Sequence, residues 1–109
     1  MKELFLNGYL IHSIICRMIQ SFRHRELKKF FENGKSSKIN DQHFKRLQLV
    51  LFKLDTAETI KDLNFPGSNL HTLSGKMQDF WSIQVSGNWR VIFRFEEGNV
   101  FDVDYVDYH

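Results

Sequence analysis

The chain has 109 residues, of which 42% are hydrophobic and 15% aromatic, so it can build one packed domain but not two, and it does not have the composition of a disordered chain. Its single cysteine, Cys16, excludes an intramolecular disulfide, and its five histidines lack the spacing of a zinc site. The formal net charge is only +2, and we expect a cytoplasmic protein that needs no metal and no other cofactor.

The first 17 residues form a broken apolar run. Asn7, Gly8 and His12 interrupt it, and the run is too short to cross a bilayer. No small-residue cleavage site follows, so the segment has neither the pattern of an export signal nor that of a membrane anchor. We expect residues 1–17 to be a dispensable extension and residues 18–109 to form the domain, without contact to a membrane.

Two amphipathic helices are predicted after a short strand. Residues 18–22 are partly apolar and precede a charged stretch, which is typical of an edge strand. Residues 24–33 have apolar side chains at helical spacing, and Gly34 supplies the stop. Asn40 can cap a second helix that continues through Asp55. The apolar stripe of that helix consists of Phe44, Leu47, Val50, Leu51 and Leu54. The two helices are expected to pack as a hairpin.

After Gly67 the apolar residues alternate with a period of two, which is the pattern of half-buried strands. Alternating runs at 80–85, 89–95 and 101–106 are separated by two glycine-containing turns, and a further strand is expected around residues 70–73. The last run places Phe101, Val103 and Tyr105 on one face. The order of strand, two-helix hairpin and antiparallel meander predicts an α+β fold, with one sheet face toward the helices and one toward solvent.

Charge is distributed unevenly along the chain. Residues 18–46 hold eight Lys and Arg against three acidic residues, whereas residues 47–109 hold five against nine. The basic residues of the first part are Arg23, Arg25, Lys28, Lys29, Lys35, Lys38, Lys45 and Arg46. Such a cluster is typical of solvated helix faces and also of nucleic-acid binding, and charge alone does not decide between the two.

Arg90, Ile92 and Arg94 occupy the alternate positions of the central predicted strand whose side chains are expected to point outward. The two arginines could pair across strands with Asp102 and Asp104. Alternatively, Arg90 clamps a phosphate, because a guanidinium offers rigid paired donors to phosphate oxygens. Spacing alone favours the cross-strand pairs.

The sequence ends with Asp107, Tyr108 and His109, directly after the last predicted strand. Chain ends commonly fray, but a sheet strand can hold this one in place. A carboxylate, a phenol and an imidazole are gathered here, and histidine exchanges a proton near neutral pH. The cluster could therefore carry general acid–base chemistry without a metal.

Four short motifs are spread between residue 18 and residue 109. They read MIQSF at 18–22, WSI at 81–83, GNWRVIF at 87–93 and DYH at 107–109. Each is weak alone, but in this order they resemble HigB-type killer toxins of the RelE/ParE toxin superfamily, which are the toxins of type II toxin–antitoxin systems. The resemblance implies a RelE-like fold of the microbial ribonuclease type.

The resemblance also implies an endoribonuclease that cleaves mRNA in the ribosomal decoding site. A ribose 2′-hydroxyl attacks the adjacent phosphate, which requires proton removal, charge stabilisation and proton delivery to the leaving oxygen. On the matching positions, Arg90 would stabilise the phosphate, His109 would transfer a proton, and Asp107 and Tyr108 would orient or assist. His71 matches a histidine of some members and would contact RNA or share the proton transfer; an ordinary surface histidine is an equal alternative.

One position departs from the pattern of several relatives, which have a catalytic lysine where this chain has Ser74. Lys76 lies two residues further on, but Gly75 is expected to turn the chain first, so whether Lys76 replaces that lysine stays open. The residues assigned to substrate or ribosomal RNA binding are Arg94, Lys76, Arg23, Arg25, Lys28, Lys29, Lys45 and Arg46. No residue is assigned to a metal.

The resemblance implies three kinds of partner: a HigA-type helix-turn-helix antitoxin, the ribosome with its rRNA and mRNA, and operator DNA through the antitoxin complex only. Two other functions stay open, a ParE-like inhibitor that binds DNA gyrase and cleaves nothing, and a non-toxic RNA- or operator-binding module. The terminal DYH motif beside Arg90 favours the enzyme, because a gyrase inhibitor does not need it.

Overall fold

The computed structural model describes the backbone of residues 5–6, 9–10 and 18–108, and the side chains of residues 18–108. The helices are α1 (Arg25–Asn33) and α2 (Phe44–Thr56), with short 3-10 helices η1 (Asp41–His43), η2 (Ile60–Leu63) and η3 (Gly75–Met77). The strands are β1 (Phe5–Leu6), β2 (Tyr9–Leu10), β3 (His71–Thr72), β4 (Phe80–Ser86), β5 (Trp89–Glu96) and β6 (Asn99–Asp107). The proposed dispensability of residues 1–17 concerns a segment that lies largely outside the described residues, and it stays a prediction.

Both predicted helices are present, and local caps explain where they begin and end. Before α1, Nδ1 of His24 accepts a hydrogen bond from the N–H of Leu27 at 3.0 Å. Gly34 ends α1 with a φ of 80°, a left-handed conformation that glycine adopts without strain. Asn40 accepts a hydrogen bond from the N–H of Gln42 at 2.9 Å and begins η1, which continues into α2. The buried stripe of α2 consists of Leu47, Val50, Leu51 and Leu54.

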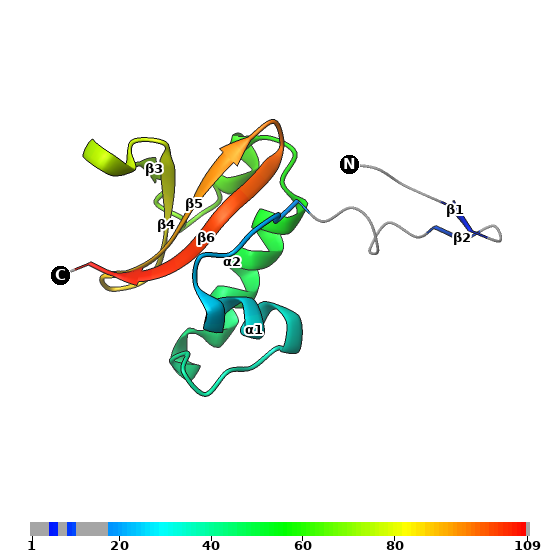
Figure 1. Ribbon diagram of the computed structural model, residues 1–109, viewed down its shortest axis with the longest axis horizontal. Helices are drawn as coiled ribbons and strands as arrows, with labels where there is room; N and C mark the ends of the chain where they lie inside the picture. The colour runs from blue at the N-terminus through cyan, green and yellow to red at the C-terminus, as the bar shows by residue number, and fades with distance from the viewer. Residues whose placement is uncertain (1–4, 7–8, 11–17, 109) are drawn as a thin grey trace.

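The main sheet has four antiparallel strands in the order β3-β4-β5-β6, as the predicted meander requires. Its inner face contributes Ile83, Val91, Phe93 and Val103 to the core, where they meet the buried stripe of α2. Figure 1 shows α2 running behind the long strands β5 and β6, with α1 near its lower end. The α+β architecture is therefore confirmed, with one sheet face covered by the helices and the other face pointing away from them.

Strand β6 contains a bulge at Asp102. The ladder pairs Ile92 with Asp104, but its next pair joins Arg94 to Phe101, so β6 has one residue more than β5 at this point. Asp102 takes up the extra length with a φ of 55°, in the left-handed region. Phe101 therefore lies on the outer side with Arg94, and the predicted strict alternation of the last strand is wrong at this residue.

Residues 18–22 run parallel to the free edge of β6. Isolated bridges join this segment to Val100 and Val103 in place of a continuous ladder. Between the bridges, the hydroxyl of Ser21 accepts a hydrogen bond from the N–H of Asp102 at 2.8 Å. The predicted edge strand thus lies at the edge of the sheet, beside β6, but the bulge interrupts its pairing with that strand.

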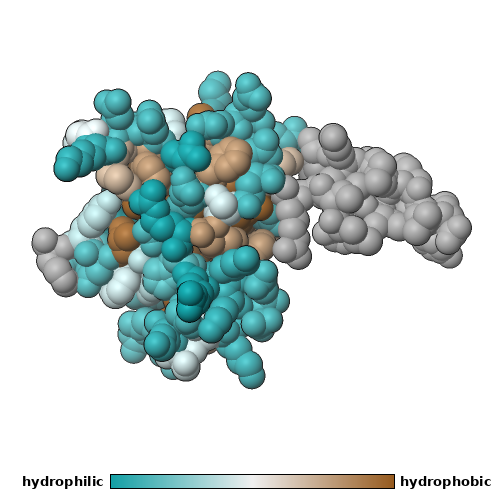
Figure 2. All heavy atoms as spheres, in the orientation of Figure 1, coloured by the Kyte–Doolittle hydropathy of each residue, from teal (hydrophilic) through white to brown (hydrophobic). Residues whose placement is uncertain are grey.

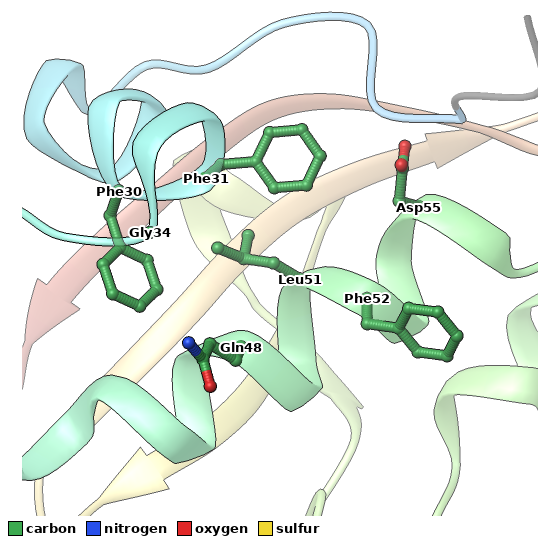
Figure 3. A pocket seen from close by; sticks show the side chains of 7 residues that line it. All are labelled: Phe30, Phe31, Gly34, Gln48, Leu51, Phe52 and Asp55. Atoms are coloured by element: carbon green, nitrogen blue, oxygen red, sulfur yellow. The ribbon is translucent and has the colours of Figure 1, made fainter. Parts of the chain in front are cut away.

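A pocket of about 250 Å³ opens between the two helices, on the helical side of the sheet (Figure 3). Its lining residues are Phe30, Phe31, Gly34, Gln48, Leu51, Phe52 and Asp55. The carboxylate of Asp55 also accepts a hydrogen bond from the N–H of Met18 at 3.0 Å, so residues 18–22 enter the domain beside this pocket.

Candidate active face

The side of the sheet away from the helices, here called the outer face, carries three cross-strand rows. They are Phe80–Arg94–Phe101, Ser82–Ile92–Asp104 and Gln84–Arg90–Val106. His71 extends the middle row onto β3, because it pairs with Ser82. Adjacent strands lie about 4.8 Å apart, and only β4 separates β3 from β5. The sheet therefore brings two predicted site residues, His71 and Arg90, to the same surface.

Arg90 is held at the turn between β4 and β5. Its Nη1 donates to the backbone carbonyl oxygens of Gly87, at 2.7 Å, and of Trp89, at 3.2 Å. The ion pairs within the described part of the chain involve Lys29 and Arg94, not Arg90. Arg90 thus presents a fixed guanidinium whose positive charge is not neutralised by a carboxylate of residues 18–108.

Arg94 has a different environment, although sequence spacing makes the two arginines look alike. Its Nε donates to Asp102 at 2.9 Å and its Nη1 to Glu96 at 2.6 Å. The hydrogen bond to Asp102 is the main reason why the pKa of Arg94 lies above its usual value. The guanidinium also lies over the ring of Phe101, 5.2 Å from the centroid. The expected cross-strand pair is therefore present at Arg94, whereas Arg90 has no carboxylate partner among residues 18–108.

The sheet holds the last described residues. Strand β6 ends at Asp107, and the N–H of Tyr108 donates to the carbonyl oxygen of Asn88 at 2.9 Å. By strand alternation, Asp107 lies on the same side of β6 as Tyr105, which is buried toward the helices. Burial, and then the charge of Asp107, raise the pKa of Tyr105 to about 12. Strand alternation gives Tyr108 the parity of the outer face. Asp107 and Tyr108 thus approach from opposite sides of the strand, and His109 lies outside the described residues.

His71 is exposed near the start of β3, and its ring is oriented by the backbone. Its Nδ1 lies 2.8 Å from the carbonyl oxygen of Asn69, which has a φ of 47°. Sequence reasoning found the histidine but not this contact, because an asparagine permits a left-handed conformation without requiring it. Ser82, its partner on β4, was also missed; it is fully buried, and its hydroxyl has no hydrogen-bond partner among the described residues.

The predicted RNA-binding residues fall into separate groups. Arg25, Lys28, Lys29 and Lys45 are exposed on the helices, and Lys29 pairs with Glu26 at 3.5 Å. Figure 2 shows hydrophilic residues over most of the face in view, with small hydrophobic patches between them. These cations on the helices are exposed to solvent, which is one of the two environments that the sequence allowed.

Three basic residues have environments that their position in the sequence did not indicate. Arg23 lies over the ring of Phe80, 5.1 Å from its centroid, and therefore belongs to the outer face. Arg46 donates to the carbonyl oxygens of Gly67, at 2.6 Å, and Gln84, at 3.2 Å, so its guanidinium fastens the loop before β3. Lys76 is exposed on η3.

The chain turns into η3 at Gly75, which has a φ of 68°. This confirms the expectation that Gly75 turns the chain before Lys76. Within residues 18–108, no three His, Cys, Asp or Glu side chains lie close enough together to hold a metal ion. No helix of that part of the chain is long and apolar enough to cross a membrane.

The order of the elements and the open antiparallel sheet with basic residues on it define the class of RelE-like toxin folds. The YoeB dimer from Staphylococcus aureus contains a chain of this fold, with a TM-score of 0.55 and 12% identity, over 86% of this chain and 98% of that one. The family described as the RelE-like toxin of the type II toxin–antitoxin system HigB matches residues 20–109. The chain belongs to this family of HigB-like toxins, and membership implies an antitoxin as its partner.

Two relatives show how far the similarity extends. The chain is 41% identical over 92 residues to the endoribonuclease HigB of Proteus vulgaris, covering 84% of this chain and all of that protein. It is 30% identical over 98 residues to the toxin HigB-1 of Vibrio cholerae serotype O1, covering 84% of this chain and 98% of that protein.

Proposed function

We propose that this toxin is an endoribonuclease that acts on mRNA being translated in the ribosomal decoding site. The 2′-hydroxyl oxygen of a ribose attacks the adjacent phosphorus and loses its proton. The bond from phosphorus to the 5′-oxygen of the next nucleotide breaks, and that oxygen takes up a proton. The products are a 2′,3′-cyclic phosphate and a 5′-hydroxyl. Similarity to the endoribonuclease HigB supports the reaction class.

The proposal rests on the way in which the backbone holds the guanidinium of Arg90. Its guanidinium is fixed at the β4–β5 turn by two backbone carbonyl oxygens and has no ion-pair partner among the described residues. A preorganised, unneutralised cation costs little reorganisation when negative charge develops on a phosphate. Arg94, which already pairs with Asp102 and Glu96, contributes at most to binding of the RNA backbone.

The proton transfers are assigned to imidazole groups. His71 lies on the outer face with Arg90, and His109 follows directly on Tyr108, which the sheet holds through Asn88. By strand alternation, the side chain of Tyr108 is directed to the outer face and can contact the substrate. Asp107 has the opposite parity, which favours a role in orienting the chain end over direct contact with RNA.

The partners follow from the same proposal. The exposed cations of the helical layer, Arg25, Lys28, Lys29 and Lys45, contact ribosomal RNA phosphates and make the affinity depend on salt. Arg23, on the outer face, and Lys76 lie closer to the substrate strand. A HigA-type helix-turn-helix antitoxin silences the toxin in the cytoplasm, and operator DNA is bound only through the antitoxin complex.

Single-turnover cleavage of mRNA on programmed ribosomes tests this function. Arg90→Ala should lower the cleavage rate roughly 10²–10³-fold, the cost typical of losing one donor to a developing anion. Arg90→Lys should recover only part of the rate, because an ammonium keeps the charge but not the paired donors. Lys61→Ala removes an exposed cation from η2 and is the matched control.

The same proteins can be induced in cells. Loss of translated mRNA that depends on Arg90 supports the proposal. Intact mRNA together with gyrase-dependent DNA breaks would instead identify a ParE-like inhibitor, and absence of both effects would identify a non-toxic binding module.

A further inference from the structure

The imidazole of His71 is bonded to the backbone of its own chain two residues earlier. Nδ1 lies 2.8 Å from the carbonyl oxygen of Asn69. A carbonyl oxygen has no proton to give, so Nδ1 must carry the hydrogen and donate it. In the neutral ring the lone pair is then on Nε2, and no group among residues 18–108 is bonded to that nitrogen.

The carbonyl is aimed at the ring because the backbone of Asn69 is left-handed, with a φ of 47°. Asparagine tolerates this region better than most residues, and β-branched residues tolerate it poorly. The segment is fixed on both sides of Asn69. The carbonyl oxygen of Ser68 accepts a hydrogen bond from the N–H of Gln84 at 2.8 Å, and His71 itself pairs with Ser82. The direction of the Asn69 carbonyl is therefore set by the fold.

We propose that Asn69 is a positioning residue, whose left-handed backbone holds His71 in the tautomer with the proton on Nδ1 and a free lone pair on Nε2. This inference rests on the proposed function, because it gives His71 the role of accepting the 2′-hydroxyl proton. The ring lies on the outer face with Arg90, so a phosphate bound at Arg90 and a base at Nε2 act on one substrate strand. Without the Asn69 contact the ring would populate both tautomers and more than one orientation.

Two substitutions separate the backbone direction from the asparagine side chain. Asn69→Gly keeps the left-handed conformation available at no steric cost and should preserve the contact. Asn69→Val disfavours that conformation and should turn the carbonyl away. Asn69→Ala is a milder second variant if the valine chain folds poorly. Amide correlation spectra show which variants keep the native fold.

The tautomer is read directly from ¹⁵N–¹H correlation spectra of the imidazole nitrogens, at about pH 8.5, where an ordinary histidine is neutral. His71→Gln identifies the His71 signals by their loss. The parent chain and Asn69→Gly should show the proton on Nδ1, and Asn69→Val or Asn69→Ala should shift toward a mixture. A parent chain with its proton on Nε2, or variants without any shift, would overturn the inference whatever the activity.

Cleavage on programmed ribosomes supplies the functional test. Asn69→Val and Asn69→Ala should lower the cleavage rate roughly tenfold at saturating ribosomes, the factor that corresponds to one lost hydrogen bond, and should leave half-saturation unchanged. Asn69→Gly should cleave like the parent. A tautomer shift without slower cleavage would remove His71 as the base, yet the endoribonuclease would stand if Arg90→Ala is inactive. If the parent chain itself cleaves nothing, the proposed function fails, while the spectra still decide the tautomer.

Discussion

Nδ1 of His43 lies 2.5 Å from the hydroxyl oxygen of Tyr105, in a contact buried between helix and sheet. His43 ends η1, directly before α2, and Tyr105 lies in β6 two residues before that strand ends. The ring of Trp89 stacks on Tyr105 with 4.5 Å between centroids. The contact therefore ties the start of the long helix to the part of β6 that leads into the C-terminal residues.

Replacing Tyr105 with Phe should destabilise the protein. The substitution keeps the stacked ring but leaves a nitrogen of the buried His43 imidazole without this partner, which costs about 1–3 kcal/mol. Urea unfolding of the two chains measures the difference. Tyr108→Phe is the matched control, because Tyr108 is 42% exposed and its hydroxyl should contribute little to stability. Equal unfolding free energies for Tyr105→Phe and the parent would mean that the contact adds nothing.

The same tyrosine should make the protein sensitive to alkaline pH. Burial, and then the charge of Asp107, raise the pKa of Tyr105 from 10.0 to about 12. An unfolded chain releases this proton near pH 10, whereas the folded chain keeps it to about pH 12. The stabilising contribution is thus complete below about pH 10 and is lost as the pH rises to about 12. Unfolding free energies measured across this window should fall more steeply for the parent than for Tyr105→Phe; parallel curves would contradict the prediction.

Two buried serines should be replaceable without loss of stability. The hydroxyl groups of Ser68 and Ser82 are fully buried, and neither has a hydrogen-bond partner among residues 18–108. Removing an unpaired buried hydroxyl is neutral or favourable by up to about 1 kcal/mol. Thermal unfolding of Ser68→Ala and Ser82→Ala measures this. A clear loss of stability in either variant would show that its hydroxyl is satisfied by an ordered water that alanine displaces.

Much of the fold was predictable because its signals are local. The end of α1 follows from Gly34, directly after the helix, and the strands follow from alternation. The bulge in β6 was not predictable in this way. Asp102 has a left-handed conformation, and its N–H donates a hydrogen bond to Ser21, which is 81 residues away in the sequence. A contact between such distant residues leaves no local sequence pattern. Strict alternation therefore placed Phe101 on the wrong face.

The candidate site shows the same limit. Arg90 and Arg94 have equivalent positions in the sequence pattern, but the cross-strand pair that spacing predicted forms only at Arg94, with Asp102; Arg90 lies opposite Val106. His71 could be recognised by its residue type. Its tautomer could not, because that depends on the backbone direction at Asn69, which the loop held by Arg46 helps to define.

The C-terminal residue offers a test of catalysis that should not disturb the fold. The sheet holds the chain end through the N–H of Tyr108 and the carbonyl oxygen of Asn88, and a chain that stops at Tyr108 retains both groups. Every core side chain of residues 18–108 is retained in the shortened chain. The unfolding free energy should therefore stay within about 0.5 kcal/mol of the parent, the range typical of surface changes.

If His109 transfers a proton in the reaction, deleting it should lower single-turnover cleavage on programmed ribosomes by about 10²–10⁴-fold, the usual contribution of a general acid or base. Ribosome binding should survive, because Arg90 and the exposed cations of the helices remain. The deletion also moves the terminal carboxylate to Tyr108, so His109→Gln, which keeps the chain length, is the matched control and should be similarly slow. A frayed chain end without a catalytic role predicts that all three proteins cleave equally fast, and that outcome would remove His109 from the mechanism. A fast His109→Gln beside a slow deletion would assign the effect to the position of the carboxylate and not to the imidazole.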